Sequence, residues 1–326
     1  MFRTDLNDLP VRLADIEAAA ARIAPFVHRT PVLTSQRLNE LLGAEVFFKC
    51  ENLQRIGAFK ARGAHNAVFG LSDAAVARGV VTHSSGNHAA ALSLAARNRG
   101  VRALIVMPSN APASKVASVR RLGGEITFCE PTVDARHAAT ELLIAEHGAA
   151  MVHPYEDPLV IAGQGTAAAE LLAQVPDLDA ILAPVGGGGL MAGTAVAARS
   201  LKPAIRIWAS EPEQADDAWR CWSSGVWTAG DPPNTIADGL RTTLGEDPYL
   251  IMRALLDDFA TVSEAGIVAS MRLVWEILKV VIEPSSAVPV AALLERKLDA
   301  AGRKVGIILT GGNLDLDQLP WQVDPS

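Results

Sequence analysis

One lysine of this chain stands where an amine can be made reactive. Lys60 follows Gly57, Ala58 and Phe59, so it lies at a turn that leads into an expected helix. Burial at such a place lowers the pKa of an amine, and a neutral amine can act as a nucleophile, as a base or as the partner of a carbonyl group. By itself the segment decides little, because most lysines at helix starts are simply solvated.

The segment Ser-Ser-Gly-Asn-His at 84–88 joins an expected strand to an expected helix. Its hydroxyls, its amide and its backbone N–H groups surround a helix N-terminus, which favours a bound carboxylate. An ordinary helix cap is the alternative, with Ser85 or Asn87 satisfying the first free N–H groups. His83 and His88 lack the spacing of a helical zinc pair, so no metal is expected here.

Four consecutive glycines at 186–189 again follow an expected strand and precede an expected helix. Free N–H groups and the helix dipole make such a loop a natural cradle for phosphate. It is not a P-loop, because no Gly-Lys-Ser/Thr follows. It also fits a dinucleotide fingerprint through Gly187, Gly189 and Ala192, with Glu211 after a second strand. On this segment alone, a phosphate site and a nicotinamide site stay equally open.

Two further turns carry chemical groups. The acidic turn at 211–217 offers carboxylates and carbonyls that can hold a hard cation such as Mg²⁺ or Ca²⁺, although an exposed capping cluster is the commoner meaning of such a turn. The turn Thr-Gly-Gly-Asn at 310–313 follows the last expected strand. There a hydroxyl and small residues let a flat group approach the backbone.

The elements that must position these groups follow an alternating pattern of short apolar runs and longer amphipathic segments. This pattern predicts an α/β fold with largely parallel sheets. A long loop or a series of broken helices is expected at 219–239. The expected strands are 45–50, 79–83, 103–107, 126–129, 180–185, 205–209 and 304–309.

Composition excludes several classes of protein. In 326 residues, 49% hydrophobic and 20% charged side chains exclude intrinsic disorder and a disulfide-stapled miniprotein. A net charge of -7 with no long basic run argues against a nucleic-acid binder. The three cysteines form no C-x-x-C pair, and the N-terminus has no apolar signal core. The uncharged stretch 180–198 contains Pro184 and the glycine run, so we do not expect it to span a membrane. Because the N-terminus has no apolar signal core, we expect a cytoplasmic protein.

In order and in type, the five segments resemble the serine racemase and serine/threonine dehydratase family of fold-type II pyridoxal-phosphate enzymes, over nearly the whole chain. The most specific matches are Gly-Ala-Phe-Lys-Ala-Arg-Gly-Ala at 57–64, Ser-Ser-Gly-Asn-His at 84–88, Gly-Gly-Gly-Gly-Leu at 186–190 and Thr-Gly-Gly-Asn at 310–313. The segments at 153–154 and 162–166 add weight. Many members have serine where this chain has Ala58. The resemblance favours pyridoxal phosphate over nicotinamide, since a dehydrogenase has no use for the lysine and the Ser-Ser-Gly-Asn loop together.

The resemblance implies that pyridoxal phosphate is attached to Lys60 and that Phe59 packs on its ring. It places the ring hydroxyl beside Asn87 and the pyridine nitrogen beside Thr310. Because a hydroxyl stabilises a protonated ring nitrogen poorly, the ring is a weaker electron sink, and a carbanion at Cα tends to expel a β-hydroxyl. The residues implied to hold the phosphate are Gly186, Gly187, Gly188 and Gly189.

The resemblance also implies a small L-3-hydroxy amino acid as substrate. Lys60 is expected to take the Cα proton on one face, the cofactor phosphate to protonate the leaving hydroxyl, and Ser85 to act on the opposite face. The outcome is dehydration of serine or threonine to a 2-oxo acid and ammonia, with serine racemisation as a second activity. Arg136 is either a surface arginine or the partner of a second carboxylate, which makes 3-hydroxyaspartate, giving oxaloacetate, the alternative substrate. The residues expected around the substrate are Ser84, Ser85, Asn87, His88 and Arg136.

Metal-binding members of the family carry a Glu-Pro-x-x-Ala-Asp-Asp run like that at 211–217. The resemblance therefore implies a Mg²⁺, Mn²⁺ or Ca²⁺ ion held by Glu211, Asp217 and the carbonyl of Ala215. It further implies a large domain made of 1–53 and 152–326, a small mobile domain at 54–151 that closes over the site, and a homodimer. An NAD-dependent oxidoreductase and a non-catalytic relative of the family are the alternatives from other classes.

Overall fold

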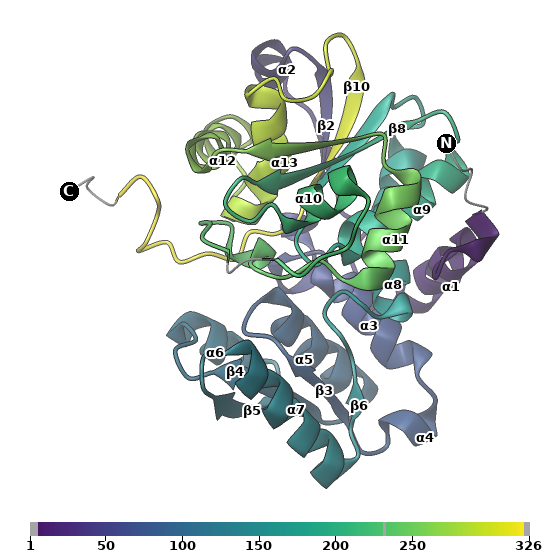
Figure 1. Cartoon of the computed structure of the whole chain (residues 1–326), viewed down its shortest axis with the longest axis vertical. Coiled ribbons are helices and arrows are strands. Elements are labelled where there is room, and N and C mark those ends of the chain that lie inside the picture. Colours follow the sequence, from purple (N-terminus) through teal and green to yellow (C-terminus); the bar gives the residue numbers. More distant parts are fainter. Residues whose placement is uncertain (1–5, 231–232, 323–326) are drawn as a thin grey trace.

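Two open sheets organise the residues that the computed structural model describes, 6–230 and 233–322 (Figure 1). In Figure 1 the larger sheet lies in the upper half of the molecule and the smaller one in the lower half. The larger sheet has the strand order β1-β2-β10-β7-β8-β9, and the smaller has the order β5-β4-β3-β6. The α/β fold expected from the sequence is confirmed.

The larger sheet is parallel except at β1 (Val32–Leu33), which pairs antiparallel with β2. Leu309 pairs with Cys50, so the carboxyl ends of two strands that are far apart in sequence meet at one edge. Buried apolar side chains fill both faces of the central strands, as parallel sheets require. The other strands are β2 (Glu45–Cys50), β7 (Ala180–Pro184), β8 (Arg206–Pro212), β9 (Asp258–Val262) and β10 (Lys304–Leu309).

The smaller sheet is parallel throughout. Its helix α5 (Asn87–Arg99) packs against β3, β4 and β5 through a run of buried alanines and leucines. Gly100 caps the C-terminus of this helix in the left-handed conformation, with a φ of 75°. The strands are β3 (Val80–His83), β4 (Ala103–Pro108), β5 (Gly124–Cys129) and β6 (Ala150–Met151), and the other helices beside them are α4 (Asp73–Val76), α6 (Ala113–Arg121) and α7 (Val133–His147).

Helix α3 (Lys60–Gly70) lies between the two halves, because it packs against α8 (Pro158–Gln174) as well as α5. The approach to α8 depends on glycine: a Cβ added at Gly163 would lie 2.6 Å from the Cα of Gly63. The remaining helices are α1 (Leu13–Ile23), α2 (Gln36–Leu42), α9 (Gly189–Leu201), α10 (Asp217–Ser224), α11 (Glu246–Leu255), α12 (Glu264–Leu278) and α13 (Pro284–Leu294), and the short 3₁₀ turns are η1 (Leu6–Asp8), η2 (Glu51–Leu53), η3 (Arg55–Gly57) and η4 (Asp238–Leu240).

Each of the seven strands expected from the sequence has an observed counterpart within a few residues. The strands β1, β6 and β9 were not anticipated: β1 and β6 have two residues each, too few to show a period. The stretch expected to be irregular begins inside α10, which continues to Ser224. The uncharged stretch 180–198 divides into β7, the glycine loop and most of α9, and no helix in the described part of the chain is long and apolar enough to cross a membrane.

Candidate active site

Lys60 is the first residue of α3, the helix that lies between the two halves of the molecule (Figure 1). Its Nζ donates a hydrogen bond to the carbonyl oxygen of Pro154 at 2.7 Å and lies 5.2 Å from the ring centre of Phe59. Burial lowers the pKa of the Lys60 amine to about 8, and no carboxylate of the described residues counteracts this effect. Near neutral pH the amine is therefore neutral more often than that of an ordinary lysine, and the neutral form is the one that acts as a nucleophile or a base.

A buried ionic network fixes the first turn of α3. Arg62, fully buried, binds Glu51 of η2 through Nε and Oε2 at 2.7 Å and Glu170 of α8 through Nη1 and Oε1 at 2.8 Å. Lys49 of β2 binds the second oxygen of Glu170 at 2.7 Å. These contacts join α3 to the larger sheet and to α8, so they set the position of Lys60 two residues earlier.

The 84–88 loop lies at the carboxyl end of β3 and leads into α5, whose first residue is Asn87. Ser84 Oγ accepts a hydrogen bond from the backbone N–H of Gly86 at 3.3 Å. His88 is buried, its Nε2 lies 3.2 Å from the carbonyl of Val152, and burial together with the nearby Lys60 holds its pKa well below the usual range. Ser84, Ser85 and Asn87 stay partly exposed. A helix N-terminus with accessible hydroxyls suits a bound carboxylate.

Asn87 reaches across to the larger half of the molecule. Its Nδ2 donates to Oε1 and Oε2 of Glu283 at 3.0 and 3.2 Å, and its Oδ1 accepts from Nδ2 of Asn313 at 2.9 Å. Burial and the neighbouring Asp238 raise the pKa of Glu283 to about 8. In the sequence, Glu283 is recognisable only as a carboxylate before a helix that begins with proline.

Thr310 follows β10 and has only 2% of its surface exposed. Its Oγ1 lies 2.9 Å from Oγ of Ser286, and its carbonyl accepts the backbone N–H of Phe59 at 2.9 Å. Ser286 also accepts the backbone N–H of Gly311 at 2.7 Å. The Thr310 turn therefore touches the Phe59-Lys60 turn directly, and it offers a hydroxyl there and no charge.

The glycine loop lies between β7 and the N-terminus of α9, a helix of 13 residues. Gly188 has a φ of 87°, and a Cβ added at Gly187 would lie 2.2 Å from the ring of Tyr155. The hydroxyl of Thr242 is buried, has no hydrogen-bond partner among the described residues, and lies 3.2 Å from where a Cβ of Gly186 would be. Backbone N–H groups and an unpartnered hydroxyl beside a helix N-terminus fit a phosphate group. Neither Tyr155 nor Thr242 carries a motif that the sequence could have revealed.

The acidic turn brings two carboxylates together away from Lys60. Glu211 of β8 is fully buried, its Oε2 accepts the N–H of Trp219 at 2.9 Å, and its Oε1 has no hydrogen-bond partner within 6–230 and 233–322. Asp217 accepts the N–H of Leu244 at 2.8 Å. Burial and the charge of Asp217 raise the pKa of Glu211 well above its usual range. Among the residues with described positions, no group of three or more His, Cys, Asp or Glu side chains is placed to hold a metal.

Arg136 lies on α7, near the carboxyl end of β3. Its Nε donates to the carbonyl of Thr132 at 3.3 Å, and in the described ranges it forms no ion pair with a carboxylate. Its positive charge acts on His83 and on Tyr155, the residue packed against Gly187. Arg136 is therefore a half-buried cation on the side of the site defined by the 84–88 loop.

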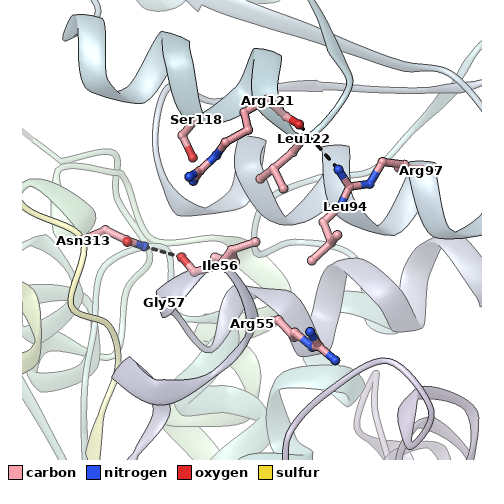
Figure 2. A pocket seen from close by; sticks show the side chains of 9 residues that line it. All are labelled: Arg55, Ile56, Gly57, Leu94, Arg97, Ser118, Arg121, Leu122 and Asn313. Atoms are coloured by element: carbon pink, nitrogen blue, oxygen red, sulfur yellow. Dashed lines mark hydrogen bonds between the residues drawn. The ribbon is translucent and has the colours of Figure 1, made fainter.

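A separate pocket of about 370 Å³ lies behind the turn that precedes Lys60, and Figure 2 shows the side chains around it. Three arginines line it, Arg55, Arg97 and Arg121, and the Nδ2 of Asn313 donates to the carbonyl of Ile56 at 2.7 Å on one side. Neither Lys60 nor the glycine loop lines this pocket, so it is distinct from the candidate active site.

The site combines the Lys60 amine of lowered pKa, a loop of backbone N–H groups at a helix N-terminus that suits a phosphate, and the uncharged hydroxyl of Thr310, which lies beside the Phe59-Lys60 turn. This set fits a cofactor that has an aldehyde, a ring nitrogen and a phosphate. A family model described as "Pyridoxal-phosphate dependent enzyme" matches residues 23–311. The chain belongs to this family. It is therefore a pyridoxal-phosphate-dependent enzyme. This decides between the two cofactors that the glycine loop alone left open, in favour of pyridoxal phosphate and against nicotinamide.

Known relatives include both lyases and racemases. The chain is 53% identical over 307 residues to a beta-hydroxyaspartate dehydratase from Paracoccus denitrificans, with 94% of this chain and 98% of the relative covered. It is 48% identical over 313 residues to a serine racemase from Dictyostelium discoideum, with 95% and 97% covered. The structure of maize serine racemase superposes with a TM-score of 0.93 at 47% identity and 96% coverage of both chains. These similarities confirm the fold-type II resemblance.

Proposed function

We propose that the enzyme dehydrates 3-hydroxyaspartate to oxaloacetate and ammonia. The substrate loses its Cα proton and its β-hydroxyl, and the released enamine tautomerises and takes up water to give the oxo acid and ammonia. The sequence places serine and threonine first. The half-buried Arg136, without a carboxylate partner in the described ranges, reverses this order, because it offers a charge-assisted site for a second carboxylate.

Different residues of this chain would bind the cofactor and transfer the Cα proton. When bound, pyridoxal phosphate withdraws electrons from the Cα of the substrate amine. Lys60 takes the Cα proton, which its lowered pKa of about 8 permits. The N–H groups at 186–189 and the start of α9 would hold the phosphate, Phe59 would pack on the ring, and Thr310 would offer an uncharged hydroxyl to the ring nitrogen.

The 84–88 loop would bind the substrate α-carboxylate and would also supply the group on the side of Cα opposite Lys60. Its partly exposed Ser84 and Ser85 and the N-terminus of α5 bind the α-carboxylate. Ser85 carries a hydroxyl that can return a proton to Cα from the side opposite Lys60. Serine dehydration with serine racemisation is therefore the second candidate function, and the 48% identity to a serine racemase favours it.

A divalent cation is the second component that we propose, Mg²⁺, Mn²⁺ or Ca²⁺ at Glu211, Asp217 and the carbonyl of Ala215. The unpartnered Oε1 of the buried Glu211 supports it, since a buried polar oxygen with no partner is costly and a bound cation would remove that cost. The oxygen-only set suits hard cations. The ion would lie at the carboxyl end of β8 and stabilise the start of α10.

We also propose that the segment 54–151 closes over the site as a mobile unit, in a homodimeric cytoplasmic enzyme. Such a motion would break contacts between this segment and the larger half, among them the hydrogen bond of the Asn87 amide with Glu283 and the ion pair of Lys115 with Asp238. Closure would exclude water while Lys60 holds the Cα proton.

The test is kcat/KM for 3-hydroxyaspartate, serine and threonine with the wild type and with Arg136→Ala. We expect the ratio of 3-hydroxyaspartate to serine to fall about 10- to 100-fold in the variant, as the loss of a charge-assisted hydrogen bond implies. An equal loss on all three substrates, or no loss, would refute the second carboxylate site. If the wild-type enzyme turns over serine but not 3-hydroxyaspartate, the result would support serine dehydration with racemisation, the second candidate function.

A further inference from the structure

Neither the carboxylate site nor the proposed proton transfer uses the imidazole ring of His88. His88 is the second residue of α5, and only 2% of its surface is exposed. Ser84 and Ser85 of the same loop remain partly exposed. The ring of His88 is therefore not one of the accessible groups that suit a substrate carboxylate, and its contacts lie in the interior of the protein.

One short segment holds both the Lys60 amine and the His88 ring. Lys60 Nζ donates to the carbonyl of Pro154 at 2.7 Å, and His88 Nε2 lies 3.2 Å from the carbonyl of Val152. Only one residue separates these two carbonyls in the chain. Because α3 also packs against α5, the first residue of α3 and the second residue of α5 are held next to each other.

The contact with Val152 determines which nitrogen of His88 carries the proton. A carbonyl oxygen can only accept, so Nε2 of the neutral ring is the donor and Nδ1 has a lone pair. This Nδ1 is buried and finds no hydrogen-bond partner within the described part of the chain. A buried acceptor without a donor destabilises the folded protein, and a donor that binds it removes that cost.

Three elements bring titratable side chains to the ring of His88. They are Lys60 of α3, His83 of β3 and His153 after β6, and Lys60 has the largest effect of the three. Burial lowers the pKa of His83 to about 4 and that of His153 to about 3, so both are neutral near pH 7. Lys60 is therefore the group among these three that can bring a positive charge to the free Nδ1.

The proposed reaction converts the Lys60 amine into an ammonium group. The lone pair of Nζ takes the Cα proton, and the ammonium has three N–H donors. The carbonyl of Pro154 accepts one of them, and another must stay directed at Cα if the proton is to return. The remaining N–H needs an acceptor, and among the described residues no carboxylate acts on Lys60.

We propose that His88 is a positioning residue for Lys60, with its Nδ1 accepting a hydrogen bond from the ammonium that forms when Lys60 takes the Cα proton. The inference rests on the proposed role of Lys60 as the base. The ring stays neutral, Nε2 keeps its proton on the carbonyl of Val152, and no proton passes from Lys60 to His88. The two acceptors, Pro154 and His88, orient the ammonium so that its third N–H faces Cα.

The acidity of the Lys60 ammonium tests this contact. In the full chain freed of cofactor the Lys60 amine is unmodified, and trace acetylation followed by peptide mass spectrometry measures its reactivity against pH. Wild type is compared with His88→Leu and with His88→Gln, whose amide can both donate to Val152 and accept from Lys60. The control is His65→Leu, which removes a fully buried histidine of α3 whose two ring nitrogens both have partners.

We expect His88→Leu to raise the acid dissociation constant of the Lys60 ammonium about 10-fold or more, the size expected for one hydrogen bond to a charged group. His88→Gln should recover most of this change, and His65→Leu should match wild type. An unchanged constant in His88→Leu, an equal change in His65→Leu, or no recovery in His88→Gln overturns the proposal.

A measurement on the wild type decides the case in which His88→Leu does not fold. With ¹⁵N-labelled histidine, the Nδ1 resonance of His88 should move as the pH passes through the pKa of Lys60, while Nε2 stays protonated. An Nδ1 resonance that does not respond to Lys60 overturns the contact. Full turnover by Lys60→Ala refutes the proposed base, whereas the role of His88 is judged by these two measurements on the cofactor-free chain.

Discussion

The side-chain amide of Asn87 binds the carboxyl group of Glu283 across the junction of the two halves, with Nδ2 lying 3.0 Å from Oε1 and 3.2 Å from Oε2. The two residues are 196 positions apart in the chain. The contact joins the helix that carries the substrate loop to the segment beside Thr310. The protonation state of one buried carboxyl group therefore affects the geometry of both.

Glu283 makes folding stability depend on pH. Burial and Asp238 raise the pKa of Glu283 to about 8 in the folded protein, against the ordinary 4.5. The folded state keeps this proton longer than the unfolded chain does, so the stabilisation is complete below the unfolded pKa and is lost as pH rises through about 8.

Glu283→Gln keeps the shape of the group and has no proton to lose. We expect the melting temperature of wild type to fall relative to the variant as pH rises from about 5 to about 9. Glu141→Gln, an exposed substitution, is the control and should track wild type. Parallel melting curves for wild type and Glu283→Gln at every pH would contradict the assignment.

Arg62 should contribute strongly to stability, because its removal leaves Glu51 buried without its cation. We expect Arg62→Leu to lower the free energy of unfolding by about 3 to 5 kcal/mol, the range for breaking a buried pair. Arg37→Leu, at an exposed site on α2, should change it by less than about 0.5 kcal/mol. Denaturant unfolding measures both. A small effect of Arg62→Leu would show that the network contributes little to anchoring α3.

Ser85 should matter more for racemisation than for elimination of an L-substrate. Elimination needs the Lys60 face alone, whereas inversion needs an acid or base on the opposite face. Assays of Ser85→Ala with both enantiomers of serine separate the two reactions. If L-serine racemises as fast as in wild type, Ser85 is a wall residue or a helix cap.

If a divalent cation binds at the acidic turn 211–217, a chelator should lower both the activity and the thermal stability of the enzyme. An ion that binds only the folded state stabilises it by mass action. Glu211→Gln should abolish the response to added Mg²⁺ or Ca²⁺, because it removes the charge at the unpartnered oxygen. If the melting curve is unchanged after thorough chelation and elemental analysis finds no metal, the proposed cation site is refuted.

The sequence predicts well those features that a contiguous segment encodes. The strands 45–50 and 304–309 coincide with β2 and β10, since a fully buried parallel strand is a short apolar run with clear ends. The glycine loop and Lys60 are recognisable for the same reason. Each combines a local backbone requirement with a chemical group in fewer than ten residues.

The residues that the sequence could not reveal depend on distant segments. Glu283 is identified by its contact with Asn87, and Thr242 by its place beside Gly186, yet each belongs to a stretch without a distinctive pattern. The resemblance assigns Asn87 to the ring hydroxyl, and in the structure its amide already binds Glu283 and Asn313. That assignment stays a prediction.

The most direct test of the account is to identify the lysine that carries the cofactor. The purified holoenzyme is reduced with borohydride and digested, and the peptides are examined by mass spectrometry for a pyridoxyl group. We expect the label on the peptide that contains Lys60, and Lys60→Ala should lose the visible cofactor absorbance after dialysis together with essentially all turnover. A label on another lysine, or a Lys60→Ala protein that keeps its absorbance and near wild-type activity, would contradict the central claim.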